Sequence, residues 1–385
     1  LIKDTGTPIE KQRFTWRELA PRPISKLDDD ALTRVRVILL NGVEHESVLF
    51  KHMAKRFTDG ALRLPMALVE RADHYQQTTV NWLLGADHSP LETTVAYEQV
   101  AIVVTASVAQ QEPDPYLAQA YRFALLEDFD HLYRYSALMD RMEGKDPNNI
   151  LQSYTDIAPG RPTEVHHRHP SDDLRQHYDR TKASLASKLH ATLITAGELQ
   201  THDYYMNIGP MFADPVARQL YAEIAQVEQA HITHYGSLVD PGETILEQWL
   251  MHEAEEAWAY YSCMESETNP RIRAIWERFV DYELGQLNMV RELMKKHEGR
   301  DPAQLLAGKV ETIRFESHRD FVRKVLADET DLRTNGTQFV PKEQEGRASQ
   351  EERARLNSEG VPSNIVAAGY QWHPGGELAR NVVNL

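Results

Sequence analysis

The sequence predicts an all-α fold, and three observations lead to this class. Apolar residues recur at helical spacing in eight segments between residues 30 and 298, and no segment alternates convincingly like a β-strand. Pro115, Pro215 and Pro270 each follow Asp or Asn, an arrangement typical of the first turn of a helix. One pattern of acids and histidines also occurs twice, as LLEDFDHLYRYSALMD and AQVEQAHITHYGSLVD. We therefore expect helical hairpins packed into a bundle.

Taken in order, the elements divide the chain into arms, hairpins and one long connection. The first residues are proline-rich and lack periodicity, as in an extended arm, whereas VPKEQEGRASQEERARLNSEG near the other end predicts a solvated tail or an arm around a neighbour. A polar connection of about 40 residues exceeds ordinary loop lengths and suits a crossover along a bundle. The predicted parts are an N-terminal arm (1–29), an accessory helical hairpin (30–90), a four-helix bundle (91–240, crossover 141–180), a second accessory hairpin (241–299) and a polar C-terminal extension (300–385).

Composition narrows the classes of function. The chain has 385 residues, of which 41% are apolar, enough for a sizeable core. Its formal net charge of −16, without a basic stripe, argues against a nucleic-acid partner. The single cysteine, Cys263, excludes a disulfide framework and a four-cysteine metal site within the chain, and we interpret it as a buried apolar residue. No signal peptide or long apolar run stands out, so we expect a cytoplasmic protein without a membrane partner; the arms favour a homodimer.

The repeated pattern places acids and histidines at matching heights of two hairpins. Each copy has an acid seventeen residues before the helix-starting proline, another acid thirteen residues after it, and a histidine three residues further on. Positions i and i+3 share a helix face, so the second acid and the histidine point together. The residues concerned are Glu98, Asp128 and His131 in the first copy, and Glu198, Glu228 and His231 in the second.

Apolar and aromatic neighbours predict that these side chains point inward. Four buried carboxylates would cost several kcal/mol each unless they are compensated. Two divalent cations would balance the four acids, and the two imidazoles would complete their ligands. Such oxygen and nitrogen donors suit iron or manganese better than a structural zinc site.

This constellation resembles the ferritin-like, rubrerythrin-like di-iron carboxylate superfamily, in which two helices each give a Glu and two others each give Glu-x-x-His. The likeness covers about residues 91–240. Asp128 departs from the family pattern because its side chain is one methylene shorter than Glu, and the neighbouring Glu127 lies about 100° round the helix. The resemblance implies two iron ions, or manganese, or a mixed pair, with O2 or peroxide as substrate and an external electron donor.

Other polar residues allow further assignments. A fainter third copy of the pattern gives an alternative metal set, which would either bind metal together with the acids of the second copy or form a second metal site. Because glutamine replaces the histidine in this copy, we favour a degenerate repeat without metal. A fourth group has irregular spacing and predicts a solvated face, and three crossover histidines predict a flexible exposed loop. Two tyrosines seven residues before the acids are either core packing or hydrogen-bond donors and radical relays near the metals. The alternative metal set is Glu253, Glu256, Glu283 and Gln286, and the fourth group is Glu44, Glu46, Glu70 and His74. The crossover histidines are His166, His167 and His169, and the two tyrosines are Tyr121 and Tyr221.

The leading hypothesis is therefore an oxidoreductase that activates O2 or peroxide at a dinuclear centre. A dimanganese catalase-like enzyme is the nearest alternative, because it uses similar ligands and needs no reductase. Iron storage and a metal-free scaffold for interactions are the alternatives from other classes. The metal content of the purified protein separates them.

Overall fold

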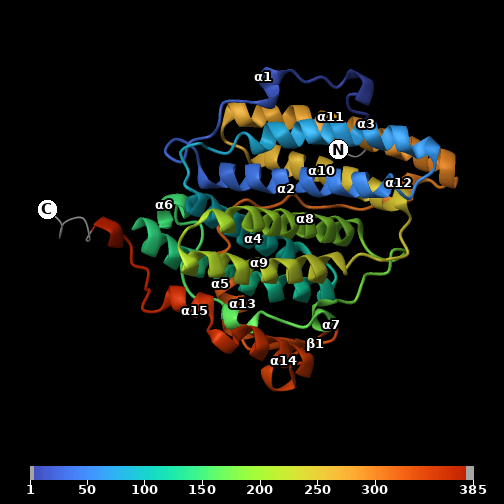
Figure 1. The fold of residues 1–385 in the computed structure, drawn as a ribbon. Helices are drawn as coiled ribbons and strands as arrows, with labels where there is room; N and C mark the ends of the chain where they lie inside the picture. The colour runs from blue at the N-terminus through green and yellow to red at the C-terminus, as the bar shows by residue number, and fades with distance from the viewer. Residues whose placement is uncertain (1–3, 379–385) are drawn as a thin grey trace.

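The all-α prediction is confirmed by the computed structural model, which describes residues 4–378 (Figure 1). The outermost residues of both predicted arms lie outside this range. Within it, eight helices are longer than twenty residues, matching the eight expected from periodicity. They are α2 (Ala31–Ala54), α3 (Gly60–Asn81), α4 (Pro90–Gln111), α5 (Pro115–Glu143), α8 (Leu185–Ile208), α9 (Pro215–Gly236), α10 (Ile245–Ser266) and α11 (Pro270–Glu298).

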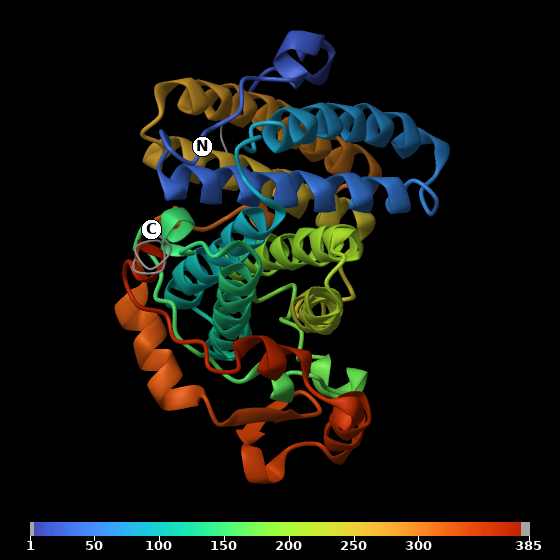
Figure 2. The same cartoon turned by 60° about the vertical axis from the view of Figure 1, so that its left-hand side comes forward.

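The eight long helices form two stacked groups of four (Figures 1 and 2). Helices α4, α5, α8 and α9 make up the first bundle, and α2, α3, α10 and α11 make up the second bundle. The two accessory hairpins therefore pack on one another as a second layer. Helices α2 and α10 make the contact between the layers: α2 packs against α4 and α8, and α10 packs against α8.

The long helices begin where side-chain caps satisfy their free amides. Asp114 accepts hydrogen bonds from the first turn of α5, Asp214 does so for α9, and Asn269 does so for α11. In each case the next residue is the proline expected at the first helical position. Gly144 ends α5 with a φ of 61°, a left-handed conformation that glycine adopts at little cost.

The connection between α5 and α8 is ordered and packs on the first bundle, contrary to the exposed loop expected for its histidines. It includes α6 (Asn148–Leu151), η2 (Thr163–Val165) and α7 (Pro170–Asp173). His166 and His167 are buried, and only His169 is exposed. Some polar side chains of this segment are buried because charged partners meet them: Arg161 and Arg168 pair with Glu127 on α5, and His167 Nε2 lies 3.6 Å from Glu223 Oε1 on α9.

Gly160 lets the connection lie directly on the backbone of α5. Its N–H donates to Asp130 Oδ1 at 3.0 Å, and the next N–H, that of Arg161, donates to the carbonyl of Leu126 at 3.1 Å. A Cβ on Gly160 would lie 2.5 Å from that same carbonyl oxygen. No side chain fits at this position without moving the connection.

Gly160→Ala is expected to lower the free energy of unfolding by about 1–3 kcal/mol, because the connection must shift away from α5. Urea denaturation followed by circular dichroism measures this change. Gly60→Ala is the matched control, since its Cβ would meet nothing within 4 Å. Equal stability of the two variants would contradict the close approach.

The C-terminal extension folds onto its own chain, which corrects the prediction of a solvated tail or an arm around a neighbour. Its helices α13 and α15 pack against α5, and α15 also packs against α9. Polar contacts hold it: the Ser363 N–H, for example, donates to Glu223 Oε2 at 2.6 Å. It also contains a two-stranded antiparallel hairpin that the sequence did not reveal. Its elements are α12 (Pro302–Leu305), α13 (Arg319–Glu329), β1 (Leu332–Asn335), β2 (Gln338–Pro341), η4 (Lys342–Gln344), α14 (Arg347–Leu356), η5 (Asn357–Glu359) and α15 (Pro362–Ala367).

The N-terminal segment is an extended arm, as predicted, with two short turns, η1 (Ile9–Lys11) and α1 (Trp16–Leu19). It lies against the second bundle, where the Thr7 N–H donates to the carbonyl of Asp281 at 2.9 Å. Cys263 is buried in α10, as expected. Across residues 4–378, none of the helices has both the length and the apolar composition of a membrane span.

Candidate metal centre

The six side chains singled out in the sequence meet inside the first bundle. Each is almost completely buried. Their ligand atoms fall into two overlapping groups, each with atoms within 4.8 Å of one another, and Asp128 and Glu228 belong to both. The groups are Glu98, Asp128, His131 and Glu228, and Asp128, Glu198, Glu228 and His231.

His131 turns one ring nitrogen toward the acids and the other toward the crossover. Its Nδ1 lies 3.0 Å from Glu228 Oε1, and its Nε2 lies 3.1 Å from Nδ1 of His166. His166 Nε2 in turn lies 2.7 Å from the carbonyl oxygen of Arg161, which can only accept. His166 must therefore donate through Nε2 and accept through Nδ1, so His131 donates through Nε2. This leaves the lone pair of His131 Nδ1 facing the acids.

His231 has the same arrangement with a different partner. Its Nε2 donates to Glu127 Oε2 at 2.9 Å, while its Nδ1 lies 3.1 Å from Glu228 Oε2 and 3.3 Å from Asp128 Oδ1. A neutral imidazole would thus direct a lone pair at carboxylate oxygens, which is repulsive unless a cation lies between them. Each histidine is oriented by a partner outside the centre, as in many metal sites.

Glu127 contacts the candidate centre but was not among the residues predicted from the sequence. It is fully buried, and its Oε1 accepts hydrogen bonds from Arg161 at 3.1 Å and Arg168 at 2.6 Å. Although burial works to raise the pKa of Glu127, the positive charge of Arg168 and its neighbours holds this pKa well below its usual value. Glu127 is therefore a stable acceptor for the His231 proton.

Burial and mutual repulsion destabilise the ionised forms of most acids in the centre. Burial raises the pKa of Glu98 well above its ordinary value, and the charges of Glu228 and Asp128 raise it further. Burial likewise raises the pKa of Glu198, with Asp128 adding to it. Glu228 differs: burial works to raise its pKa, but hydrogen bonds with His131 and His231, which form when a proton is on Nδ1 of these rings, lower it. Without a metal ion, protons on the acids and on the imidazoles must therefore offset the buried negative charge.

The two tyrosines proposed from the sequence do not donate hydrogen bonds to the six side chains within the described part of the chain. The Tyr221 hydroxyl pairs with Thr94 at 2.6 Å, and the Tyr121 ring stacks on Tyr235. These contacts correspond to core packing. The tyrosine that reaches the acids is Tyr205, whose hydroxyl donates to Glu98 Oε1 at 2.5 Å. It lies seven residues after Glu198, so the same two-turn spacing applied in the other direction would have found it.

The alternative metal set belongs elsewhere in the fold. Glu253, Glu256, Glu283 and Gln286 are buried in the second bundle, where Glu256 and Glu283 form a separate group of acids with Glu44 and Asp73. An assignment that joins them to Glu198, Glu228 and His231 is therefore wrong, because the two groups lie in different layers.

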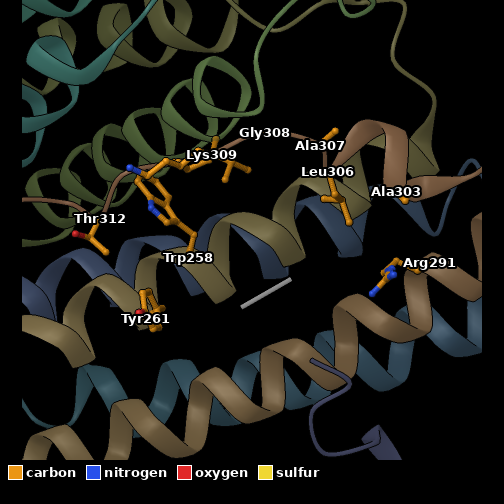
Figure 3. A pocket seen from close by; sticks show the side chains of 11 residues that line it. Trp258, Tyr261, Arg291, Ala303, Leu306, Ala307, Gly308, Lys309 and Thr312 are labelled. Atoms are coloured by element: carbon orange, nitrogen blue, oxygen red, sulfur yellow. The ribbon is translucent and has the colours of Figure 1, made fainter. Parts of the chain in front are cut away.

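A pocket of about 500 Å³ is also separate from the six side chains. Figure 3 shows Trp258, Tyr261 and Arg291 around it, together with Leu306 and its neighbours from the segment that follows α12. Its walls are mainly apolar and none of the six acids and histidines lines it. The chemistry suggested by buried ligands thus lies inside the first bundle and not in this pocket.

Glu127→Gln is expected to weaken metal binding at the first bundle by about 10- to 100-fold, because an amide orients His231 less firmly than a buried carboxylate. Competition with a chelator of known affinity measures the change. Glu329→Gln is a suitable control, since Glu329 pairs with Arg122 on the outer side of α5. Metal affinity that is equal in both variants would contradict the role of Glu127.

No protein-family model, no curated protein and no solved structure matches this chain. Its function must therefore be inferred from the arrangement of these side chains.

Proposed function

We propose that the chain is a dinuclear-metal oxidoreductase that activates O2 or peroxide, built on a ferritin-like bundle. One observation carries this proposal: six ligand residues from four neighbouring helices converge in one buried space. Glu98 comes from α4 and Glu198 from α8, while α5 and α9 each contribute an acid and the histidine three residues later. This division of ligands among helices is similar to that of di-iron carboxylate proteins.

Unpartnered atoms support the fit of two ions to these residues. Buried oxygens without a hydrogen-bond partner among residues 4–378 include both of Asp128, Oε2 of Glu98, Oε2 of Glu198 and Oε1 of Glu228. Unsatisfied buried carboxylate oxygens are costly, and they are scarce in folded proteins. Metal ions held by the six side chains would satisfy these oxygens together, and Asp128 and Glu228 belong to both ligand groups.

Iron, or manganese in its place, would supply the redox chemistry toward O2 or peroxide when bound. The chain itself would exclude water and orient the ligands. Glu127 and His166 hold the outer nitrogens of the two imidazoles, so both inner nitrogens stay directed at the acids. Tyr205 holds the carboxylate of Glu98.

A route for electrons from an external donor is suggested by the aromatic residues next to Glu98. The Tyr205 ring lies 5.7 Å from that of Tyr221, and both rings line a surface pocket of about 160 Å³ with Met206 and Arg218. The single cysteine leaves the chain without a four-cysteine iron site of its own, so an external reductant is needed. We propose that the reductant docks at this pocket, beside Tyr205 and Tyr221.

Elemental analysis of anaerobically purified protein, together with optical spectra before and after air exposure, tests the proposed function. Iron or manganese is expected at two ions per first bundle, with O2 consumption by the reduced protein or breakdown of peroxide. Peroxide breakdown without a reductant, at a manganese-loaded centre, would favour the catalase-like alternative. Protein free of both metals would favour the scaffold, and many ions in a large assembly would favour storage.

A further inference from the structure

The second bundle contains an acid cluster of its own, built to the same plan as the first. One carboxylate comes from each of its four helices, and their ligand atoms lie within 4.8 Å of one another. Glutamine stands three residues after an acid at Gln76 and Gln286, where the first bundle has its histidines. The four carboxylates are Glu44 on α2, Asp73 on α3, Glu256 on α10 and Glu283 on α11.

This finding corrects the interpretation of Glu44 as part of a solvated face. Glu44 is fully buried, whereas Glu70 is half-buried and His74 is exposed. The partner of Glu44 on α3 is Asp73, twenty-nine residues later, which nearly matches the thirty residues between Glu98 and Asp128.

Lys51 occupies one side of the second cluster. Its fully buried Nζ lies 2.6 Å from Asp73 Oδ2, 2.8 Å from Glu253 Oε1 and 3.6 Å from Glu256 Oε2. A single ammonium cannot neutralise five buried carboxylates. We interpret Lys51 as a protein cation on one side of a cluster that still carries excess negative charge.

The other side of the cluster presents oxygens without hydrogen-bond partners among the described residues. They are one oxygen each of Glu44 and Glu283 and Oε1 of Glu256, while Oε2 of Glu256 has only the ion pair with Lys51. The amide oxygen of Gln286 also lacks a hydrogen-bond partner, although any nearby donor could give it a hydrogen bond. Its amide nitrogen lies 3.3 Å from Glu283 Oε1, which places this side chain within the cluster.

We infer that the second bundle binds one hard divalent cation through Glu44, Asp73, Glu256 and Glu283, beside the ammonium of Lys51. Every available donor there is oxygen, because glutamine replaces histidine, and such a set favours Mn²⁺, Mg²⁺ or Ca²⁺ over the softer metals. The cluster thus holds a single metal ion, and it is independent of the centre in the first bundle.

Mn²⁺ binding to the full-length chain tests this inference. The unchanged protein should bind three Mn²⁺, and His131→Ala with His231→Ala should still bind one, with the six-line paramagnetic resonance signal of an isolated ion. Adding Glu256→Gln and Glu283→Gln to that variant should weaken the remaining site at least about 100-fold, whereas Glu277→Gln, an exposed change on α11, should not.

Absence of Mn²⁺ binding in the histidine variant would overturn the inference, and so would a site that survives the two glutamine changes. Failure of the proposed function gives a different result, namely equal Mn²⁺ binding with and without the histidines. Lys51→Met provides a check that keeps all carboxylates: removal of the ammonium should tighten Mn²⁺ binding about tenfold or more. Unchanged or weaker affinity in a folded Lys51→Met chain would also overturn it.

Discussion

A chain that carries both His131→Ala and His231→Ala is expected to lose two metal ions and at least about 100-fold of its O2- or peroxide-consuming activity. Both imidazoles direct Nδ1 at the same acids, so their loss removes the nitrogen donors and leaves the carboxylates to repel one another. Elemental analysis and steady-state O2 or peroxide consumption measure the two effects.

His234→Ala is the matched control for that experiment. His234 is also buried on α9, one turn beyond His231, but its Nε2 donates to the carbonyl of Ala120 at 3.1 Å and does not face the acids. This variant should lose some stability and keep its two ions. If the double variant retains the metal content of the control, the ions do not bind at these histidines.

Removal of metal by a chelator is expected to cause the second large effect, a loss of folding stability. An ion present at a thousandfold excess over its dissociation constant stabilises the folded state by about 4 kcal/mol, because the unfolded chain lacks the site. Stripping two ions would also return Glu98, Glu198 and their neighbours to mutual repulsion in a buried space. Urea denaturation with and without chelator measures the difference.

The histidine double variant supplies the comparison for this second result. Its first bundle has no ions to lose, so the chelator should reduce its stability only by the contribution of the second bundle. An equal loss in the double variant and the unchanged protein would show that the stabilising ions bind outside the first bundle.

The convergence of the six side chains could be predicted from the sequence because their placement obeys local rules. Asp128 with His131, and Glu228 with His231, share faces of single helices, and equal offsets from two prolines place them at one height. Periodicity alone gave the eight long helices. The packing of the outer hairpins on one another depends on contacts between distant helices, which periodicity does not show.

Residues held by distant segments could not be found in this way. Glu127 points away from Asp128 on α5 and gains its role from Arg161 and Arg168, which lie more than thirty residues further along the chain. His166 belongs to a polar, turn-rich stretch, and only its buried partners distinguish it from an exposed loop. The extension was misjudged for the same reason, since its polar residues meet buried acids of other elements.

The second cluster was predicted only in part: the alternative set contained Glu256 and Glu283, but Asp73 was not recognised and Glu44 was assigned to a solvated face. Glutamine is not a typical metal ligand, so Asp73 with Gln76 did not stand out, and the spacing from Glu44 is one residue short of the other copies. Lys51 lies two turns beyond Glu44, where a lysine ordinarily marks a solvated face.

Arg161 ties the candidate metal centre to α13 in the C-terminal extension. Besides Glu127, its guanidinium donates to the carbonyls of Glu329 at 3.2 Å and Thr330 at 3.4 Å, at the end of α13. The four ligand-bearing helices are consequently not a detachable module. A shortened chain meant to preserve the geometry of His231 would have to extend at least to residue 330, and a fragment that stops after α9 would leave a buried guanidinium short of two acceptors.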